Sequence, residues 1–171
     1  MKSIFFIFLF ALLICKMVAA QNDTIAIEYK RVAADCDKAI PLRIIQKTTY
    51  GPTLAPKGFG ERQEIVAQSK NSNTAFEKEH HSAWYLLKMA FDGELAFDIT
   101  PQDSSNDYDF ILYAYTDSGF CAQVQQGKAR VIRSNIRRNN PGNKGVTGLA
   151  IGAQSELQAQ GPGAQFSKSL M

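Results

Sequence analysis

The chain has 171 residues, which suits one domain of ordinary size. Its 19 lysines and arginines stand against 16 aspartates and glutamates, and 45% of its residues are hydrophobic. This composition is typical of a folded protein of low net charge, and it excludes the strongly basic surface of a nucleic-acid-binding protein.

The first segment, residues 1–20, predicts a secretory signal peptide with a helical apolar centre. Lys2 supplies a basic start, Ile4–Ile14 is an unbroken apolar run, and Val18–Ala20 offers small residues to a peptidase. The run is too short to span a membrane, which takes roughly 20 apolar residues. Cleavage before Gln21 removes two lysines and leaves 17 basic against 16 acidic residues.

Two alternatives to simple cleavage stay open. The run can remain uncut as an anchor, although Lys16 interrupts it, or Cys15 can carry a lipid, although bulky Ile14 precedes it. Each places the chain outside the cytoplasm, in the periplasm or at the outer membrane. Residues 21–35 are a mixed lead-in, and residues 36–171 form the predicted domain.

Two cysteines, Cys36 and Cys121, remain after the leader is removed. In an oxidising compartment they can form a disulfide that closes a loop of some 85 residues. Two separately buried thiols are the equal alternative, because the sequence does not show that their Cα atoms come close enough.

The domain is predicted to be all-β, an antiparallel β-sandwich or jelly roll. Short apolar stretches within residues 37–50 indicate one or two strands, and a loop rich in glycine and proline follows over residues 51–60. Ser82–Ala90 and Glu94–Thr100 read as two strands, the second with a period of two. Asp92-Gly93 between them predicts a hairpin turn.

Further strands are predicted at Tyr108–Thr116 and Ala129–Ile136, and no helix is predicted after the leader. Strands at this spacing, separated by turn residues, are typical of a sandwich. Ala164–Met171 reads as the start of one more strand. We therefore expect an unpaired edge there and a domain that is incomplete at its C-terminus.

No set of residues suggests catalysis. The two histidines, His80 and His81, are adjacent, and neighbours in a strand point to opposite faces. They cannot readily form one catalytic pair or share one metal. We therefore expect that the chain is not an enzyme.

The best candidate site is an acidic loop between two predicted strands. Calcium binds six to eight oxygen atoms from carboxylates, amides and backbone carbonyls. The same residues also suit a turn in which they accept hydrogen bonds from backbone N–H groups, and this reading is favoured. The candidate calcium ligands are Asp98, Asp103, Asn106, Asp107 and Asp109.

Two tyrosines of the Tyr108–Thr116 strand are a candidate contact surface. Tyr113 and Tyr115 share a face with Asp109, which suggests that this face meets solvent. Aromatic residues at this spacing also occur as cross-strand pairs, and Trp84 is expected to pack between the sheets.

The middle of the chain resembles a known family. Ala-Trp-Tyr at residues 83–85, Asp-Gly at 92–93, Asp-Ile-Thr-Pro at 98–101 and Asp-Tyr-Asp-Phe-Ile-Leu-Tyr at 107–113 are similar to the pre-peptidase C-terminal-like β-sandwich. In particular they resemble the N-terminal domain of OmpA-like bacterial envelope proteins. The likeness runs from Cys36 to the end, with Arg133–Asn135 and Gly145–Leu149 also matching.

This resemblance implies a non-catalytic module that continues past Met171 and that binds or scaffolds at the bacterial cell envelope. In some related sandwiches the Asp-x-Asp strand binds calcium, and Asp107 and Asp109 occupy the matching positions. The implied partner is an envelope protein or a glycan, and no nucleic acid. The alternative function is an accessory domain of an exported hydrolase.

Overall fold

The computed structural model describes residues 27–29, 33–45, 47–53, 56–65, 76, 78–139 and 141–171. The predicted leader, residues 1–20, and the candidate lipid site Cys15 lie outside these ranges, as does most of the lead-in. The all-β class that the sequence predicts is confirmed, because strands in several small sheets dominate the described residues and the one α-helix is short.

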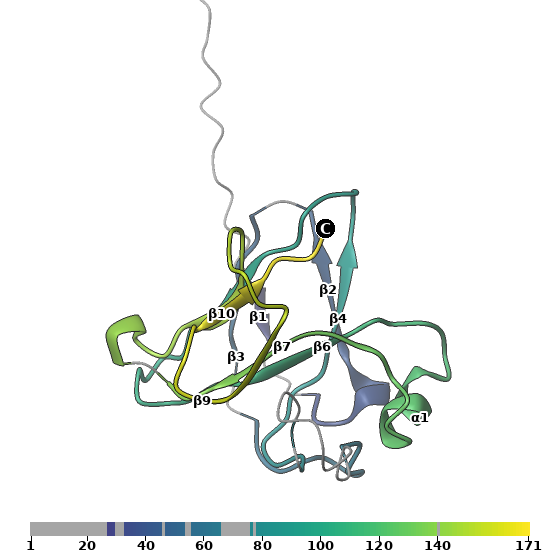
Figure 1. Cartoon of the computed structure of the whole chain (residues 1–171). Helices are drawn as coiled ribbons and strands as arrows, with labels where there is room; N and C mark the ends of the chain where they lie inside the picture. The colour runs from purple at the N-terminus through teal and green to yellow at the C-terminus, as the bar shows by residue number, and fades with distance from the viewer. Residues whose placement is uncertain are drawn as a thin grey trace, which may run out of the picture.

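Strands in the first half of the domain form two parallel pairs (Figure 1). β1 (Ile27–Tyr29) pairs with β3 (Tyr50–Thr53), and β2 (Ile40–Ile44) pairs with β4 (Tyr85–Met89) over five residues of each strand. A 3₁₀ turn at Cys36–Lys38 leads into β2.

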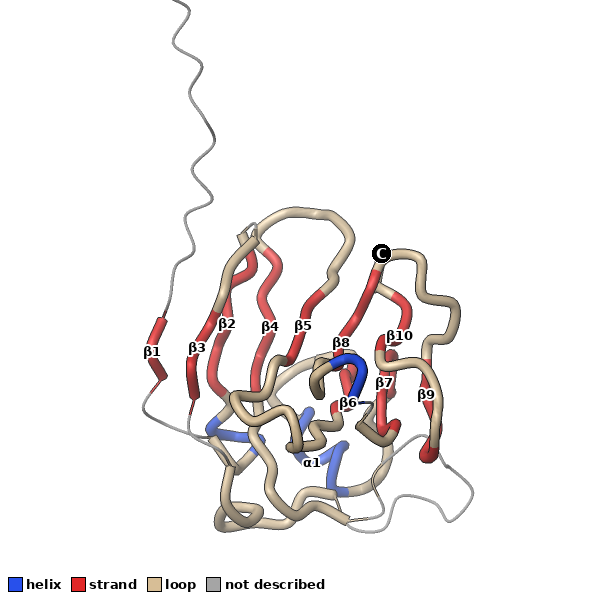
Figure 2. The backbone as a smooth tube through the Cα atoms, turned by 90° about the vertical axis from the view of Figure 1, so that its left-hand side faces the viewer, coloured by secondary structure: helices blue, strands red, loops and turns tan. Residues whose placement is uncertain are grey.

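The second half contributes two three-stranded sheets (Figure 2). One has the order β10–β8–β5 and the other the order β6–β7–β9, and β10 contacts both β7 and β9. A second 3₁₀ turn covers Pro141–Asn143. The strands are β5 (Phe97–Ile99), β6 (Phe110–Tyr113), β7 (Val131–Arg137), β8 (Thr147–Ala150), β9 (Leu157–Gly161) and β10 (Phe166–Lys168).

The pairing is mixed, whereas the sequence predicted antiparallel strands. β5–β8 and β6–β7 are antiparallel, but β1–β3, β2–β4, β7–β9 and β8–β10 are parallel. Parallel neighbours need long connections. Hydrophobic periodicity shows which face of a strand is buried but not which strand lies beside it, so the pattern could not reveal this topology.

The predicted hairpin at Asp92-Gly93 is wrong. β4 pairs with β2 and β5 pairs with β8, so the strands on either side of this dipeptide are not partners. A two-residue type I′ turn needs positive φ at both central positions. Gly93 does not adopt a positive φ, so the chain bends there without closing a hairpin.

Two elements that the sequence analysis missed position the core. Helix α1 (Phe120–Gln125) buries Phe120 and Val124 one turn apart, and Gly127 follows it with a φ of 65°. Strand β8 is buried on both faces, so it lacks the alternation that marks an exposed strand. Gly148 in β8 has a φ of 155°, and an added Cβ would lie 1.9 Å from the Phe97 carbonyl oxygen, so only glycine fits there.

Candidate functional site

A disulfide joins Cys36 and Cys121, which is one of the two states that the sequence left open. It links the 3₁₀ turn before β2 to helix α1, with 5.8 Å between the two Cα atoms. Ile65, Phe120 and Val124 form the buried core with Cys36. The bond therefore fastens two distant segments at the centre of the hydrophobic core.

Three buried carboxylates lie in the segments that meet next to Cys36, and no periodic pattern in the sequence marks them. The first is Asp35, whose Oδ1 accepts hydrogen bonds from the backbone N–H groups of Glu61 (2.8 Å) and Arg62 (3.0 Å). Its Oδ2 accepts one from Lys38 Nζ at 3.2 Å. Burial opposes the charged form, but these donors prevail and lower the pKa of Asp35.

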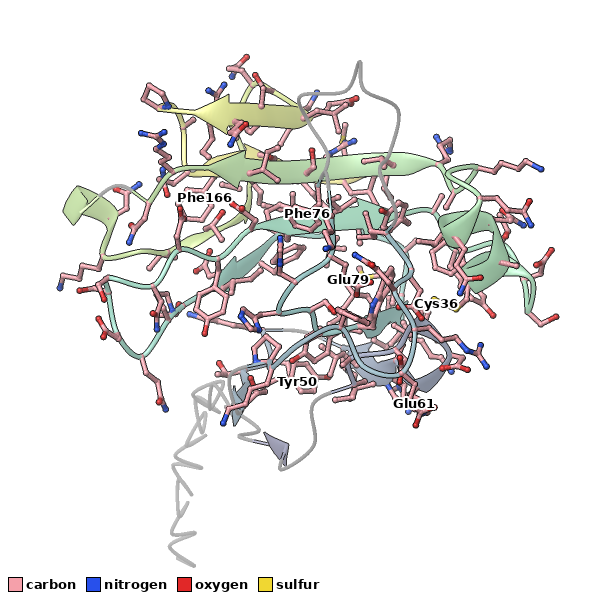
Figure 3. All side chains as sticks on the ribbon, turned by 90° about the horizontal axis from the view of Figure 1, so that it is seen from below. Cys36, Tyr50, Glu61, Phe76, Glu79 and Phe166 are labelled. Carbon is pink, nitrogen blue, oxygen red and sulfur yellow. A yellow bond between two sulfur atoms is a disulfide. The ribbon has the colours of Figure 1, made fainter. Side chains whose placement is uncertain are left out.

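The second carboxylate, Glu79 (Figure 3), binds backbone N–H groups of the described segment that ends at Ile65. Its Oε2 accepts hydrogen bonds from the N–H groups of Glu64 (2.8 Å) and Ile65 (3.3 Å), and its Oε1 accepts one from Trp84 Nε1 at 3.1 Å. A segment without regular structure must satisfy its backbone groups by other means. The Glu79 side chain does so here and fixes the indole of Trp84 as well.

The third carboxylate, Glu64, is 1% exposed, and only one of its two oxygen atoms accepts a hydrogen bond. Its Oε1 accepts a hydrogen bond from the Cys36 N–H at 3.1 Å, whereas its Oε2 is buried and has no hydrogen-bond partner. Burial raises the pKa of Glu64 to about 7, and the charges of Glu79 and Asp35 act in the same direction. The protein therefore holds a buried carboxyl that keeps its proton at pH values where an ordinary glutamate has lost it.

The predicted acidic loop is only partly brought together. Asp98 lies on β5, and Asp103 accepts hydrogen bonds from the backbone N–H (2.9 Å) and the hydroxyl (2.7 Å) of Ser105. The Asn106 N–H donates to the Asp103 carbonyl oxygen at 3.0 Å. These contacts make the Asp-rich turn that the sequence favoured.

Asp107 and Asp109 form the part of this loop where charges interact. Partial burial of its carboxyl raises the pKa of Asp109 to about 7, and the neighbouring Asp107 charge adds to the effect. Within the part of the chain that the structure describes, no group of three or more histidine, cysteine, aspartate or glutamate side chains is arranged to hold a metal.

The two candidate contact tyrosines have different surroundings. Tyr113 is half-buried and stacks on Trp84, with 6.2 Å between ring centroids, and it meets Phe120 edge-on. Tyr115 also packs against Phe120, with 5.4 Å between ring centroids, and remains 56% exposed. Tyr113 thus belongs to the hydrophobic packing, and Tyr115 is the exposed end of a row of aromatic rings.

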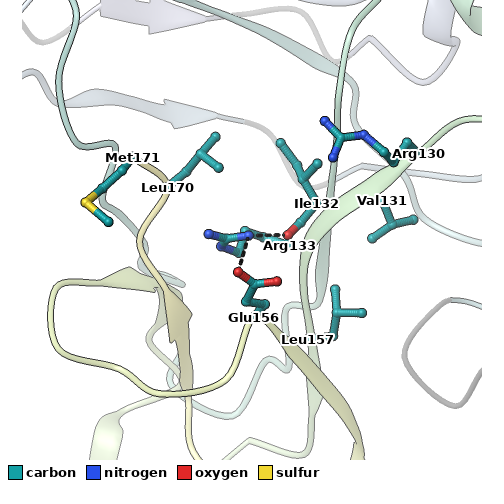
Figure 4. A pocket seen from close by; sticks show the side chains of 8 residues that line it. All are labelled: Arg130, Val131, Ile132, Arg133, Glu156, Leu157, Leu170 and Met171. Atoms are coloured by element: carbon teal, nitrogen blue, oxygen red, sulfur yellow. Dashed lines mark hydrogen bonds and ion pairs between the residues drawn. The ribbon is translucent and has the colours of Figure 1, made fainter.

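A pocket of about 410 Å³ lies beside β7 and the last residues of the chain (Figure 4). Its apolar wall includes Leu157 and Leu170, and its buried cation is Arg133. The guanidinium donates to the carbonyl oxygens of Ile132, Lys168 and Ser169, and it lies 3.4 Å from the Glu156 carboxylate. Because these donors point at protein oxygens, Arg133 holds the fold together here.

The strand predicted at residues 164–171 exists as β10, but its backbone is not left unpaired. It pairs with β8 on one side, and Leu170 forms an antiparallel bridge with Leu95. Side chains of β7 and β9 donate to further backbone oxygens of this segment. Asn135 Nδ2 donates to the Ala164 carbonyl oxygen and Gln158 Nε2 to the Phe166 carbonyl oxygen. Arg133 donates to the carbonyl oxygens of Lys168 and Ser169. The edge that the sequence predicted is thus occupied by side-chain donors.

No transmembrane helix is found among the described residues, since none of their helices combines the required length with the required hydropathy. Comparisons of the chain with models of protein families, with curated proteins and with solved structures found no match.

Proposed function

We propose that the chain is an exported, non-catalytic module that binds or scaffolds at the bacterial cell envelope, with the β-sandwich of the pre-peptidase C-terminal-like type. The observation that carries the proposal is the Cys36–Cys121 disulfide. Such bonds form and persist in oxidising compartments and are rare in the cytosol. The predicted leader, residues 1–20, supplies the route to such a compartment.

An oxidising compartment also matters for the stability of the fold, because the disulfide can form there. Closing a loop of 85 residues in the unfolded chain favours the folded state by about 4 to 5 kcal/mol in the chain-entropy treatment. This is a large share of the 5–15 kcal/mol that typically stabilises a domain. A protein that relies on it is suited to the periplasm or the outer membrane.

The proposed partner is an envelope protein or a glycan. The row of rings that ends in exposed Tyr115 supports this proposal, because a ring held by Phe120 loses little freedom when it stacks on a partner. Calcium is the proposed cation of the neighbouring loop. A divalent ion would relieve the repulsion between Asp107 and Asp109 that contributes to the raised pKa of Asp109.

The proposal is tested by sedimenting the secreted chain with isolated bacterial envelopes. We expect co-sedimentation that Tyr115→Ala weakens, whereas Ile151→Ala, a matched change at an exposed apolar residue elsewhere, leaves it unchanged. Equal recovery in the supernatant with and without envelopes would overturn the proposal. Binding only to the polymer substrate of an exported hydrolase would favour the accessory-domain alternative.

A further inference from the structure

The ends of β2 and β4 carry cations that face each other, and no described acidic residue forms an ion pair with them. These strands are parallel neighbours (Figure 1). Their register sets Arg43 directly opposite Lys88. Residues opposite each other on adjacent strands project to the same face, and like charges in this arrangement are destabilising. Exposed Lys47 follows β2 at the same end.

The ion pairs among the described residues do not include these cations. They involve Lys38, Arg62 and Arg133 instead. Along the sequence, the acidic residues that follow Lys88 most closely are Asp92 and Glu94, and the Glu94 carboxylate accepts a hydrogen bond from the Ser169 hydroxyl. Three basic side chains therefore lie at the ends of these two strands, with no ion pair to a described acidic residue.

Exposed apolar side chains share this end with the cations. Phe91 is 67% exposed, Ile45 is 44% exposed and Met89 is 43% exposed. Ile44 is paired with Met89, and the Ala90 N–H donates to the Ile44 carbonyl oxygen at 2.8 Å, so the two chain segments run together as they leave the sheet. We use the name β2–β4 tip for the exposed apolar residues Ile45, Met89 and Phe91 together with the basic residues Arg43, Lys47 and Lys88.

We propose that the β2–β4 tip docks end-on against an anionic membrane surface, with the cations contacting lipid headgroups and the exposed side chains of Ile45 and Phe91 entering the interface. Charge complementarity selects this partner. Basic residues near an anionic bilayer are each attracted to it, and aromatic and aliphatic side chains add burial at the headgroup boundary. A polyanion without an apolar layer would satisfy the cations but would leave Phe91 in water.

This inference deepens the proposed function, because it adds a lipid contact to an envelope-binding module. It also makes the contact reversible, since neither a spanning helix nor a covalent lipid is needed for it. Attraction of this kind weakens as salt screens the charges, whereas burial of the apolar side chains does not.

The experiment is sedimentation of the secreted chain with vesicles of phosphatidylglycerol and phosphatidylcholine, or of phosphatidylcholine alone. The secreted form avoids the apolar run Ile4–Ile14, which would itself enter lipid. We expect binding to the anionic vesicles that falls as salt is raised. Each basic residue near such a surface contributes about fivefold to partitioning, so Arg43→Glu with Lys88→Glu should lower binding more than twentyfold.

Two matched variants separate this contact from general effects of charge and hydrophobicity. Lys128→Glu with Arg130→Glu makes the same change in net charge at exposed residues that follow α1 in the sequence, and should lower binding much less. Helix α1 lies at the opposite end of the molecule from the ends of β2 and β4 (Figure 1). Phe91→Ser should reduce binding severalfold, whereas Ile151→Ser should not, although Ile151 is equally exposed.

Three results would overturn the inference: no binding to anionic vesicles, equal losses from both charge reversals, or an unaffected Phe91→Ser variant. The last result, with binding to a soluble polyanion retained, would identify an acidic polymer as the partner. Loss of vesicle binding with envelope sedimentation intact would reject the lipid contact and leave the proposed function standing. Vesicle binding without envelope sedimentation would reject the proposed function and leave the lipid contact standing.

Discussion

Replacing Glu64 by glutamine tests whether a buried, protonated carboxyl is built into the core beside the disulfide. Glutamine keeps the shape of Glu64 and an oxygen for the Cys36 N–H, and it cannot lose a proton. Folding raises the pKa of Glu64 from its ordinary 4.5 to about 7. Between these values the unfolded chain binds fewer protons than the folded chain does, so stability falls as pH rises.

The size of this effect follows from the pKa difference. A difference of about 2.5 pKa units, at about 1.4 kcal/mol per unit, amounts to about 3 kcal/mol. This stability is fully present below pH 4.5 and is lost as pH rises through 7. Urea unfolding of both proteins at several pH values between 4.5 and 8 should therefore show the wild type losing about 3 kcal/mol relative to Glu64→Gln.

The difference in stability between the wild type and Glu64→Gln reports the titration of Glu64 alone. Asp109, whose pKa is also raised to about 7, is present in both proteins and cancels from the difference. Glu61→Gln is the matched control, because Glu61 lies in the same loop with its side chain 76% exposed. A stability difference between wild type and Glu64→Gln that stays constant across this pH range would refute the reasoning.

Three further predictions concern the disulfide, the C-terminal strand and calcium. Reduction of the disulfide, or its removal by Cys36→Ser with Cys121→Ser, should lower the unfolding free energy by about 2 to 5 kcal/mol in urea; an unchanged midpoint would contradict its structural role. Arg133→Met leaves the Lys168 carbonyl without its guanidinium donor and should cost about 3 kcal/mol, with Arg133→Lys restoring part of it; equal stability of all three proteins would contradict this. Calcium should raise the melting temperature of the wild type and not of Asp107→Ala, and no shift in the folded wild type would reject the calcium site.

The all-β class was predictable because alternating apolar residues and frequent turn residues are local properties. The two strands best marked in this way, Tyr108–Thr116 and Ala129–Ile136, appear as β6 and β7 and pair with each other. Strand partners are not local, so Asp92-Gly93 was wrongly read as a hairpin. Helix α1 was missed because six residues carry little periodicity, although Gly119 and Gly127 on either side mark its ends.

The candidate site was predictable to a smaller extent. The cysteines could be paired once their compartment was inferred, whereas the closeness of their Cα atoms depends on the fold. Asp35, Glu64 and Glu79 lie in irregular segments, and nothing in their spacing shows that they converge on buried N–H groups. Charged residues in a loop are ordinarily solvated, so only the folded arrangement reveals their role.

The most direct test of the central claim is the intact mass, without reduction, of the protein recovered from the envelope fraction of producing cells. We predict a chain that begins at Gln21 and is lighter by two hydrogens than its reduced form, which corresponds to the Cys36–Cys121 disulfide. An intact chain from Met1 with both thiols free in the cytoplasm would contradict the account.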